Sequence, residues 1–303
     1  MTRRDLTNIP ASVHARLLSR AKAHGESYDQ MLQYFAIERF LYRLSLTQWG
    51  ERFVVKGAIM LRAWSTPLGR PTRDIDFLGE IGNSPTAVER AVSDCLAVEY
   101  PDDGLVFDSA VETSEINVAD RYPGVRAVVR GNLDRGTFRL QLDIGIDDAV
   151  VPEPEWVEYP TLLDLDAPRI LAYHPSTALA EKLETIVRKG LANSRLKDYY
   201  DIWLLSTLYS YDGAEFAASI LATFTHRGTA IPFDTPPGLT SAFYESAGAQ
   251  ARWRSFLSSR EIEAPEDLAG VCATIGGFIM PPASAVAAGE AFEMRWEPSV
   301  GWS

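Results

Sequence analysis

The sequence predicts an α+β fold, in which a mixed β-sheet domain with flanking helices is followed by a mainly helical domain. Apolar residues recur with helical spacing near both ends of the chain, whereas strand-like alternation is concentrated between residues 52 and 146. The length of 303 residues is near the limit at which single cores stop growing. We therefore expect a sheet domain with an N-terminal helical pair over residues 1–165 and a helical domain over residues 166–303.

The first 48 residues predict two amphipathic helices. Pro10 suits the first position of one helix, which ends before Gly25. Ser27 and Gln30 have the spacing of a capping box that starts the other helix. The apolar period then changes, and short strands with a helical turn between them are expected at residues 52–56, 57–63 and 73–78.

The remaining sequence alternates helix and strand signals and then becomes mainly helical. Two strand-like runs, residues 124–131 and 137–146, are joined by turn residues and predict a hairpin. Residues 151–174 carry four prolines and little periodicity, so we expect a connecting segment there. Helices are expected at residues 84–97, 175–189 and 196–208, after a cap at Asp212, and near residues 240–258 and 265–275.

The charge balance limits the partners of the protein. The chain has 29 Lys and Arg against 41 Asp and Glu, a formal net charge of -12. This balance opposes a wide nucleic-acid groove, which depends on many basic side chains. The acidity is local, however, because residues 91–120 hold eight acidic residues and no Lys or Arg, whereas residues 182–197 hold five basic residues and one acid. A compact basic pocket for a triphosphate and one RNA end remains compatible with this distribution.

Several functional classes are disfavoured by the sequence. Cys95 and Cys272 are too few and too far apart for a disulfide framework or a cysteine metal site. No G-x-S-x-G, H-E-x-x-H or C-x-x-C motif occurs. The N-terminus lacks a secretory signal, and no stretch approaches the roughly 18 apolar residues of a membrane span. We expect a cytoplasmic protein without a membrane partner.

The sharpest local signal is the pair Asp74 and Asp76. Residues two apart on a strand point to the same face, so both carboxylates can reach one divalent cation. A lone D-x-D is more often an exposed strand edge. Asp143 adds a third carboxylate on a later strand, where apolar neighbours make an unpaired charge expensive.

A glycine turn precedes this pair. Gly57 stands at a strand-to-helix turn after Lys56, where the backbone amides of Gly57 and Ala58 can approach a phosphate closely. Such a glycine is often an ordinary turn residue. Combined with Asp74, Asp76 and a later acid, however, it matches the requirements of two-metal phosphoryl transfer.

The run from Lys56 to Leu78, KGAIMLRAWSTPLGRPTRDIDFL, resembles the active-site segment of nucleotidyltransferase toxins of the AbiEii/AbiGii type, a family that includes the mycobacterial MenT toxins. The resemblance continues in the K-L-x-x-x-x-R motif from Lys182 to Arg188 and the D-x-x-D motif formed by Asp198 and Asp201. It covers roughly residues 10–205. Ala58 departs from the pattern, because family members commonly have Gly or Ser there and Ala58 offers no hydroxyl.

The resemblance implies a nucleotidyltransferase-like fold and a site with defined roles. The implied catalytic residues are Asp74, Asp76, Asp143, Lys182 and Asp198, of which Asp74, Asp76 and Asp143 would hold Mg²⁺ or Mn²⁺. The implied nucleotide-binding residues are Lys56, Gly57, Ala58, Arg73, Lys182, Arg188, Asp198 and Asp201. The implied activity is transfer of a nucleoside monophosphate from an NTP to an RNA acceptor, the tRNA 3′ end, to block translation. The implied protein partner is a cognate antitoxin.

Two alternatives remain open at this point. A metal-dependent glycosyltransferase with a D-x-D motif would explain Asp74 and Asp76, but it would not explain the motifs at Lys182 and Asp198. A catalytically degenerate nucleotide-binding or partner-binding module would agree with the departure at Ala58. Release of a nucleoside diphosphate from a sugar donor would favour the first alternative, and NTP binding without turnover would favour the second.

Overall fold

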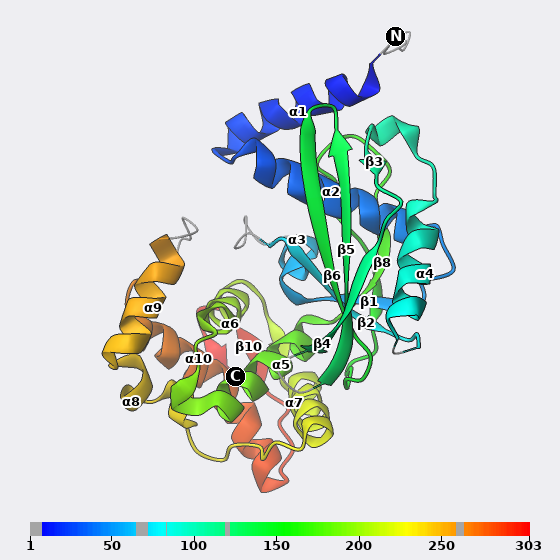
Figure 1. Cartoon of the computed structure of the whole chain (residues 1–303). Helices are drawn as coiled ribbons and strands as arrows, with labels where there is room; N and C mark the ends of the chain where they lie inside the picture. Colours follow the sequence, from blue (N-terminus) through cyan, green and yellow to red (C-terminus); the bar gives the residue numbers. More distant parts are fainter. Residues whose placement is uncertain (1–7, 65–71, 83, 119–121, 259–263) are drawn as a thin grey trace. The chain divides into compact units, whose positions relative to one another are not determined.

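The computed structural model describes residues 8–64, 72–82, 84–118, 122–258 and 264–303 (Figure 1). The chain divides into two compact units. The first unit contains Met1–Asp147 and Glu155–Ala172, and the second contains Asp148–Pro154 and Tyr173–Ser303. The segment from Asp148 to Pro154 thus leaves the first unit and returns to it.

A mixed sheet forms the centre of the first unit. Its strand order is β3-β5-β6-β2-β1-β8-β7, and β4 pairs with β5. The β2–β6 and β1–β8 pairs are parallel and the other pairs are antiparallel. The strands are β1 (Phe53–Lys56), β2 (Asp74–Gly79), β3 (Val106–Phe107), β4 (Glu112–Val118), β5 (Tyr122–Leu133), β6 (Gly136–Gly145), β7 (Glu155–Glu158) and β8 (Arg169–Ala172).

Helices cover one face of this sheet. They are α1 (Ile9–His24), α2 (Tyr28–Ser45), the single turn α3 (Met60–Ala63) and α4 (Pro85–Leu96). The predicted capping at Ser27 is confirmed, since its hydroxyl accepts a hydrogen bond from the Gln30 amide, and α1 ends at Gly25 with φ 70°. In Figure 1, α2 crosses the β5–β6 hairpin, and these elements pack together. Apolar side chains of the strands face the helices, which leaves the opposite face for polar residues.

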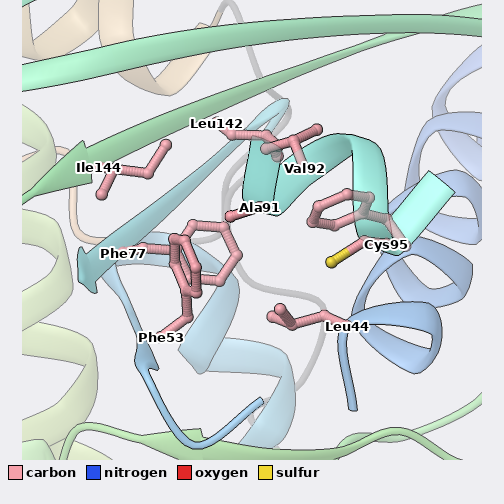
Figure 2. A pocket seen from close by; sticks show the side chains of 9 residues that line it. Leu44, Phe53, Phe77, Ala91, Val92, Cys95, Leu142 and Ile144 are labelled. Carbon is pink, nitrogen blue, oxygen red and sulfur yellow. The ribbon is translucent and has the colours of Figure 1, made fainter. Parts of the chain in front are cut away.

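The alternation along β2 and β6 separates the two faces. Phe77 and Ile144 are buried on the helix-covered side, whereas Asp76 and Asp143 are only partly buried on the other. A cavity of about 10 Å³ lies on the helix-covered side, among apolar side chains of α2, β1, β2, α4 and β6 (Figure 2). Because it is apolar and holds at most about one water, this cavity is a packing defect of the core and is no ligand site.

The second unit is mainly helical. Its helices are α5 (Pro175–Lys189), α6 (Leu196–Leu208), α7 (Gly213–Arg227), α8 (Ser241–Tyr244), α9 (Ala247–Ser258) and α10 (Leu268–Ala288). The strands β9 (Tyr211–Asp212), β10 (Arg295–Glu297) and β11 (Gly301–Trp302) form a small second sheet. Phe278 of α10 stacks on Phe216 of α7 and on Trp302 of β11, so aromatic packing joins this sheet to the helices.

Some expectations from the sequence are wrong. Residues 151–174 are more than a connection, because they contain β7 and β8. The prolines do not interrupt these strands: Pro154, Pro160 and Pro168 lie just outside the strand ends, where the lack of an amide hydrogen is tolerated. The long strand β4 and the small second sheet were also not anticipated.

The expectation that no stretch resembles a membrane span also needs correction. Within the part of the chain that the structure describes, α10 alone is long and apolar enough to cross a membrane by length and composition. The sequence signal of this helix is weak because many of its residues are Ala, Gly and Pro, which are weakly apolar, although no charged residue interrupts them. Val271, Ile275 and Phe278 of α10 are completely buried, so one side of α10 belongs to the core of the second unit.

Candidate active site

Four charged residues form a row across the polar face of the first unit's sheet. Residues that pair directly on neighbouring strands point to the same face. Lys56 on β1 pairs with Asp76 on β2, and Asp76 pairs with Asp143 on β6. Asp143 in turn pairs with Arg126 on β5. This charged row therefore places two carboxylates side by side, with a basic residue on either flank.

Asp74 adds a second carboxylate on β2. It lies two residues before Asp76, so the two side chains share a face, and Ile75 between them is completely buried on the other side. Asp74 is exposed, whereas Asp76 is half-buried. The predicted D-x-D pair thus stands on the polar face of a central strand, between β1 and β6.

Gly57 lies against this pair. Its φ is 78°, and a Cβ atom added to it would clash with the carboxylate of Asp76. The chain can therefore approach Asp76 this closely only because residue 57 has no side chain. Lys56 is 8% exposed and Ala58 is 9% exposed. The helical turn expected after Gly57 is confirmed: a 3₁₀ turn (Gly57–Ile59) is followed by the four-residue α3.

Asp143 is held by an arginine that sequence reasoning missed. Arg126 Nε donates to Asp143 Oδ1 at 2.7 Å, and Arg126 Nη2 donates to Asp143 Oδ2 at 2.8 Å. This pair raises the pKa of the Arg126 guanidinium, and the negative charges of Asp74 and Asp76 add to the effect. In the amide orientation that satisfies both its ends, Gln141 accepts from Arg126 Nη2 at 3.1 Å. The signal was present in the hairpin, since counting outward from its turn pairs residue 126 with residue 143.

Two of the three predicted acidic residues suit a divalent-cation site. Among the residues that the structure describes, no three Asp, Glu, His or Cys side chains gather closely enough to hold a metal ion. The predicted trio thus shares one face without forming a three-carboxylate group. Mg²⁺ is usually held by one or two carboxylates together with substrate phosphates. Asp74 and Asp76 supply the two carboxylates of such a site. The backbone of Gly57 lies directly against the Asp76 carboxylate.

Arg73 precedes β2 and has an exposed side chain. Its carbonyl oxygen accepts a hydrogen bond from Gln33 Nε2 at 3.1 Å, and the same nitrogen donates to the Arg139 carbonyl at 3.0 Å. Gln33, which lies on helix α2, therefore links the residue that precedes β2 to strand β6. Residues 65–71, in the middle of the motif that begins at Lys56, lie outside the described residues.

A second cluster, in the helical unit, brings together three other predicted residues. Lys182 on α5 donates from Nζ to Asp201 Oδ2 at 2.7 Å and lies 3.6 Å from Asp198 Oδ1, both acids being on α6. The two carboxylate side chains are each 1% exposed, and Lys182 is 15% exposed. Arg195 Nε binds the other oxygen of Asp198 at 2.7 Å. Asp198 Oδ1 is buried and accepts no hydrogen bond from the residues the structure describes.

Arg188 belongs to a neighbouring network on α5. Its Nε lies 3.2 Å from Glu184 Oε1, one helical turn away. Glu184 also binds the buried guanidinium of Arg227, which contacts Asp148 at 2.7 Å and Glu181 at 3.4 Å. The sequence did not single out Arg227, because a lone basic residue at the end of a helix resembles an ordinary dipole-compensating cap.

The model of the family described as "Nucleotidyl transferase AbiEii toxin, Type IV TA system" matches residues 39–285. A search of the curated proteins gives no match.

Three solved structures are similar over most of their length. MenT4, a nucleotidyltransferase toxin from Mycobacterium tuberculosis, is 21% identical with a TM-score of 0.47, over 92% of this chain and 98% of that one. A putative nucleotidyltransferase from H. pylori is 12% identical with a TM-score of 0.48, over 87% and 96% of the two chains. JHP933 from Helicobacter pylori is 13% identical with a TM-score of 0.50, over 87% and 94%.

The family match covers both the D-x-D strand and the Lys182 cluster. It confirms the resemblance drawn from the sequence motifs. Since it spans well over half of the 303 residues, the chain belongs to the AbiEii family of nucleotidyltransferase toxins of toxin–antitoxin systems.

Proposed function

We propose that this toxin transfers a nucleoside monophosphate from an NTP to an RNA acceptor, with Asp74 and Asp76 at the catalytic centre. The observation that supports this most strongly is the charged row, in which Asp76 and Asp143 lie side by side between Lys56 and Arg126. Paired carboxylates attract a divalent cation, and flanking bases attract phosphate oxygens. The row therefore has the charges that an NTP–metal complex requires.

In the proposed reaction, a hydroxyl oxygen of the acceptor attacks the α-phosphorus of the NTP. The bond to the oxygen that bridges the α- and β-phosphorus breaks, pyrophosphate leaves, and the hydroxyl proton passes to water. Mg²⁺ or Mn²⁺, when bound, would neutralise charge on the phosphates. Asp74 and Asp76 would hold this cation, and Asp143 completes the acidic side of the row. Lys56 and the backbone at Gly57 and Ala58 border the same face and are proposed to contact phosphate oxygens, as is the exposed Arg73.

The Lys182 cluster is proposed to bind nucleotide as well. Lys182 is held between Asp198 and Asp201, both nearly completely buried, so its ammonium group has a fixed position on α5. The buried Asp198 Oδ1 has no hydrogen-bond donor among the described residues, which suits contact with a ligand donor. Arg188, six residues further along the same helix, is proposed as an additional phosphate contact.

The proposed acceptor is RNA, specifically the tRNA 3′ end, whose modification would block translation in the cytoplasm. The net charge of -12 favours an acceptor that is engaged at one end rather than along a wide groove. As a member of a toxin–antitoxin family, the chain is expected to be restrained by a cognate antitoxin.

The proposal is tested by incubating the purified protein with total RNA and each α-labelled NTP in turn, with and without Mg²⁺. We expect label to enter RNA only with the metal and to be lost in Asp74→Ala and Asp76→Ala. Glu115→Gln, at an exposed position on β4 of the same sheet, is the matched control and retains transfer. Label transfer that persists in both aspartate variants would contradict the proposed centre. NTP binding without transfer would favour a nucleotide-binding module instead.

A further inference from the structure

Arg126 has a fixed orientation and an unused donor edge. Its Nε and Nη2 both donate to Asp143, an arrangement that locks the plane of the guanidinium to the carboxylate. A guanidinium carries five N–H donors, and these two bonds do not use the donors of Nη1. Within the described part of the chain, Nη1 of Arg126 makes no hydrogen bond. The pair therefore presents a positively charged edge in a defined direction.

The two basic ends of the charged row differ in accessibility. Lys56 is 8% exposed, whereas the Arg126 side chain is 37% exposed. Both acids between them, Asp76 and Asp143, lie on the same face. A ligand that arrives from solvent thus meets Arg126 as the accessible cation of the row, next to the carboxylates that are proposed to attract the metal.

The position of this pair distinguishes it from a second ion pair on the same strand. Arg130, four residues further along β5, makes the same kind of two-bond contact with Glu112 on the neighbouring strand β4. Its partner is 62% exposed, and exposed pairs of this kind contribute little stability. Asp143, by contrast, is 16% exposed and directly adjoins Asp76. Strand β5 thus takes part in one ion pair at a remote, solvated position and in another beside Asp76.

We propose that Arg126 binds a phosphate of the nucleoside triphosphate and that Asp143 acts as its positioning residue. This inference deepens the proposed function and rests on it. Both oxygens of Asp143 are engaged by Arg126, so Asp143 orients the arginine while Asp74 and Asp76 serve the cation. The three carboxylates then have two roles. Asp74 and Asp76 hold the metal ion, and Asp143 orients the guanidinium that binds the triphosphate.

Nucleotide binding tests the proposal without requiring turnover. The dissociation constant of a non-hydrolysable NTP analogue with Mg²⁺ is measured by calorimetry for the full chain and its variants. We expect Arg126→Gln to weaken binding about tenfold or more, as for the loss of a charge-assisted hydrogen bond. Arg126→Lys, which keeps the charge without the fork, is expected to fall between wild type and Arg126→Gln. Arg130→Gln removes an equal charge from the same strand and is expected to bind as wild type does.

The role of Asp143 is tested by a double-variant cycle and by metal binding. Asp143→Asn should weaken nucleotide binding. Adding it to Arg126→Gln should have little further effect, because each change alone already removes the oriented Arg126 guanidinium. In Mn²⁺ titrations without nucleotide, followed by electron paramagnetic resonance, Asp76→Asn should lose most of the affinity. Asp143→Asn should lose about threefold or less, an effect of charge alone.

Three results would overturn the inference. One is nucleotide binding by Arg126→Gln equal to that of wild type. Another is a loss of Mn²⁺ affinity in Asp143→Asn as large as in Asp76→Asn, which would make Asp143 a metal ligand. The third is an Arg126→Gln defect confined to RNA binding. Failure of the proposed function is distinguishable from these, because it appears as wild-type protein that binds the nucleotide analogue but transfers no label.

Discussion

The carboxylate of Asp76 occupies the space in which a Cβ atom of residue 57 would lie. The glycine after β1 and the second aspartate of the D-x-D pair thus depend on each other sterically, although 19 positions separate them in the sequence. The absence of a side chain at residue 57 is therefore required for the observed position of the Asp76 carboxylate.

Gly57→Ala should therefore impair activity more than stability. An alanine at φ 78° costs roughly 1–2 kcal/mol, and its Cβ displaces the Asp76 carboxylate. We expect transfer to fall about a hundredfold, as for small misplacements of catalytic groups. Gly25→Ala is the matched control, because Gly25 has φ 70° and open space around its Cβ position. Similar melting temperatures with an activity loss in Gly57→Ala alone are expected; equal activity in the two variants would contradict this account.

The Lys182 cluster should show separate structural and functional contributions. Lys182→Met leaves the nearly buried Asp198 and Asp201 without their shared cation, which should cost about 3–5 kcal/mol in unfolding free energy. Adding Asp201→Asn removes one of the two charges and should restore much of that stability. Urea unfolding and label transfer are measured on both variants. Recovery of activity together with stability would show that Lys182 is structural only.

Arg227 is expected to be a major stabilising residue of the helical unit. Burial opposes its charge, but Glu181, Asp148 and Glu184 raise the pKa of the guanidinium overall. Arg227→Met would remove the buried cation that these three carboxylates share and should lower the unfolding free energy by about 3–5 kcal/mol. Arg295→Met, which breaks the exposed pair with Glu297, should change it by less than about 1 kcal/mol. Equal effects of the two changes on urea unfolding would contradict the importance of this network.

Glu38 should make stability depend on pH. Burial raises the pKa of this carboxyl from 4.5 to about 7, although Arg39 and the Leu162 amide partly oppose the shift. Below pH 4.5 the group is protonated in both the folded and unfolded states. Between pH 4.5 and 7 the unfolded state ionises first, so the unfolding free energy falls as pH rises, by about 3 kcal/mol over the whole window.

The unfolding free energies of the wild type and Glu38→Gln are measured by urea unfolding across this pH range. The Gln variant keeps an acceptor for the Leu162 amide but does not titrate. The wild type should lose stability relative to Glu38→Gln as pH rises toward 7 and should run parallel to it above that value. A difference that is constant from pH 4.5 to 7 would refute the assignment to Glu38.

The sequence predicts most elements that have strong local signals. The helices at α1, α2, α5 and α6 and the β5–β6 hairpin carry clear periodicity, capping or turn residues, and the structure contains each of them. The strands β7 and β8 have four residues each and stand among prolines, so their identity depends on pairing with distant strands. Pairing of this kind is decided by tertiary contacts that local patterns do not encode.

The candidate site is predictable to a similar extent. Asp74, Asp76 and Asp143 stand out because acids within apolar strands are unusual, and the fold places them on one face. Arg126 does not stand out, since it is one of several arginines on strands with a polar face. Its importance comes from the hairpin register, which pairs it with Asp143, and from the exposure that distinguishes it from Lys56.

The most direct test of the central claim is the ratio of pyrophosphate released to nucleotide incorporated into RNA, measured in the same reaction. For the wild type we predict one pyrophosphate for each nucleotide. Asp76→Asn should lose both products together, whereas Glu115→Gln should retain both. Incorporation without pyrophosphate, or products undiminished in Asp76→Asn, would contradict the claim that the Asp74 and Asp76 carboxylates form the centre of a nucleotidyl-transfer site.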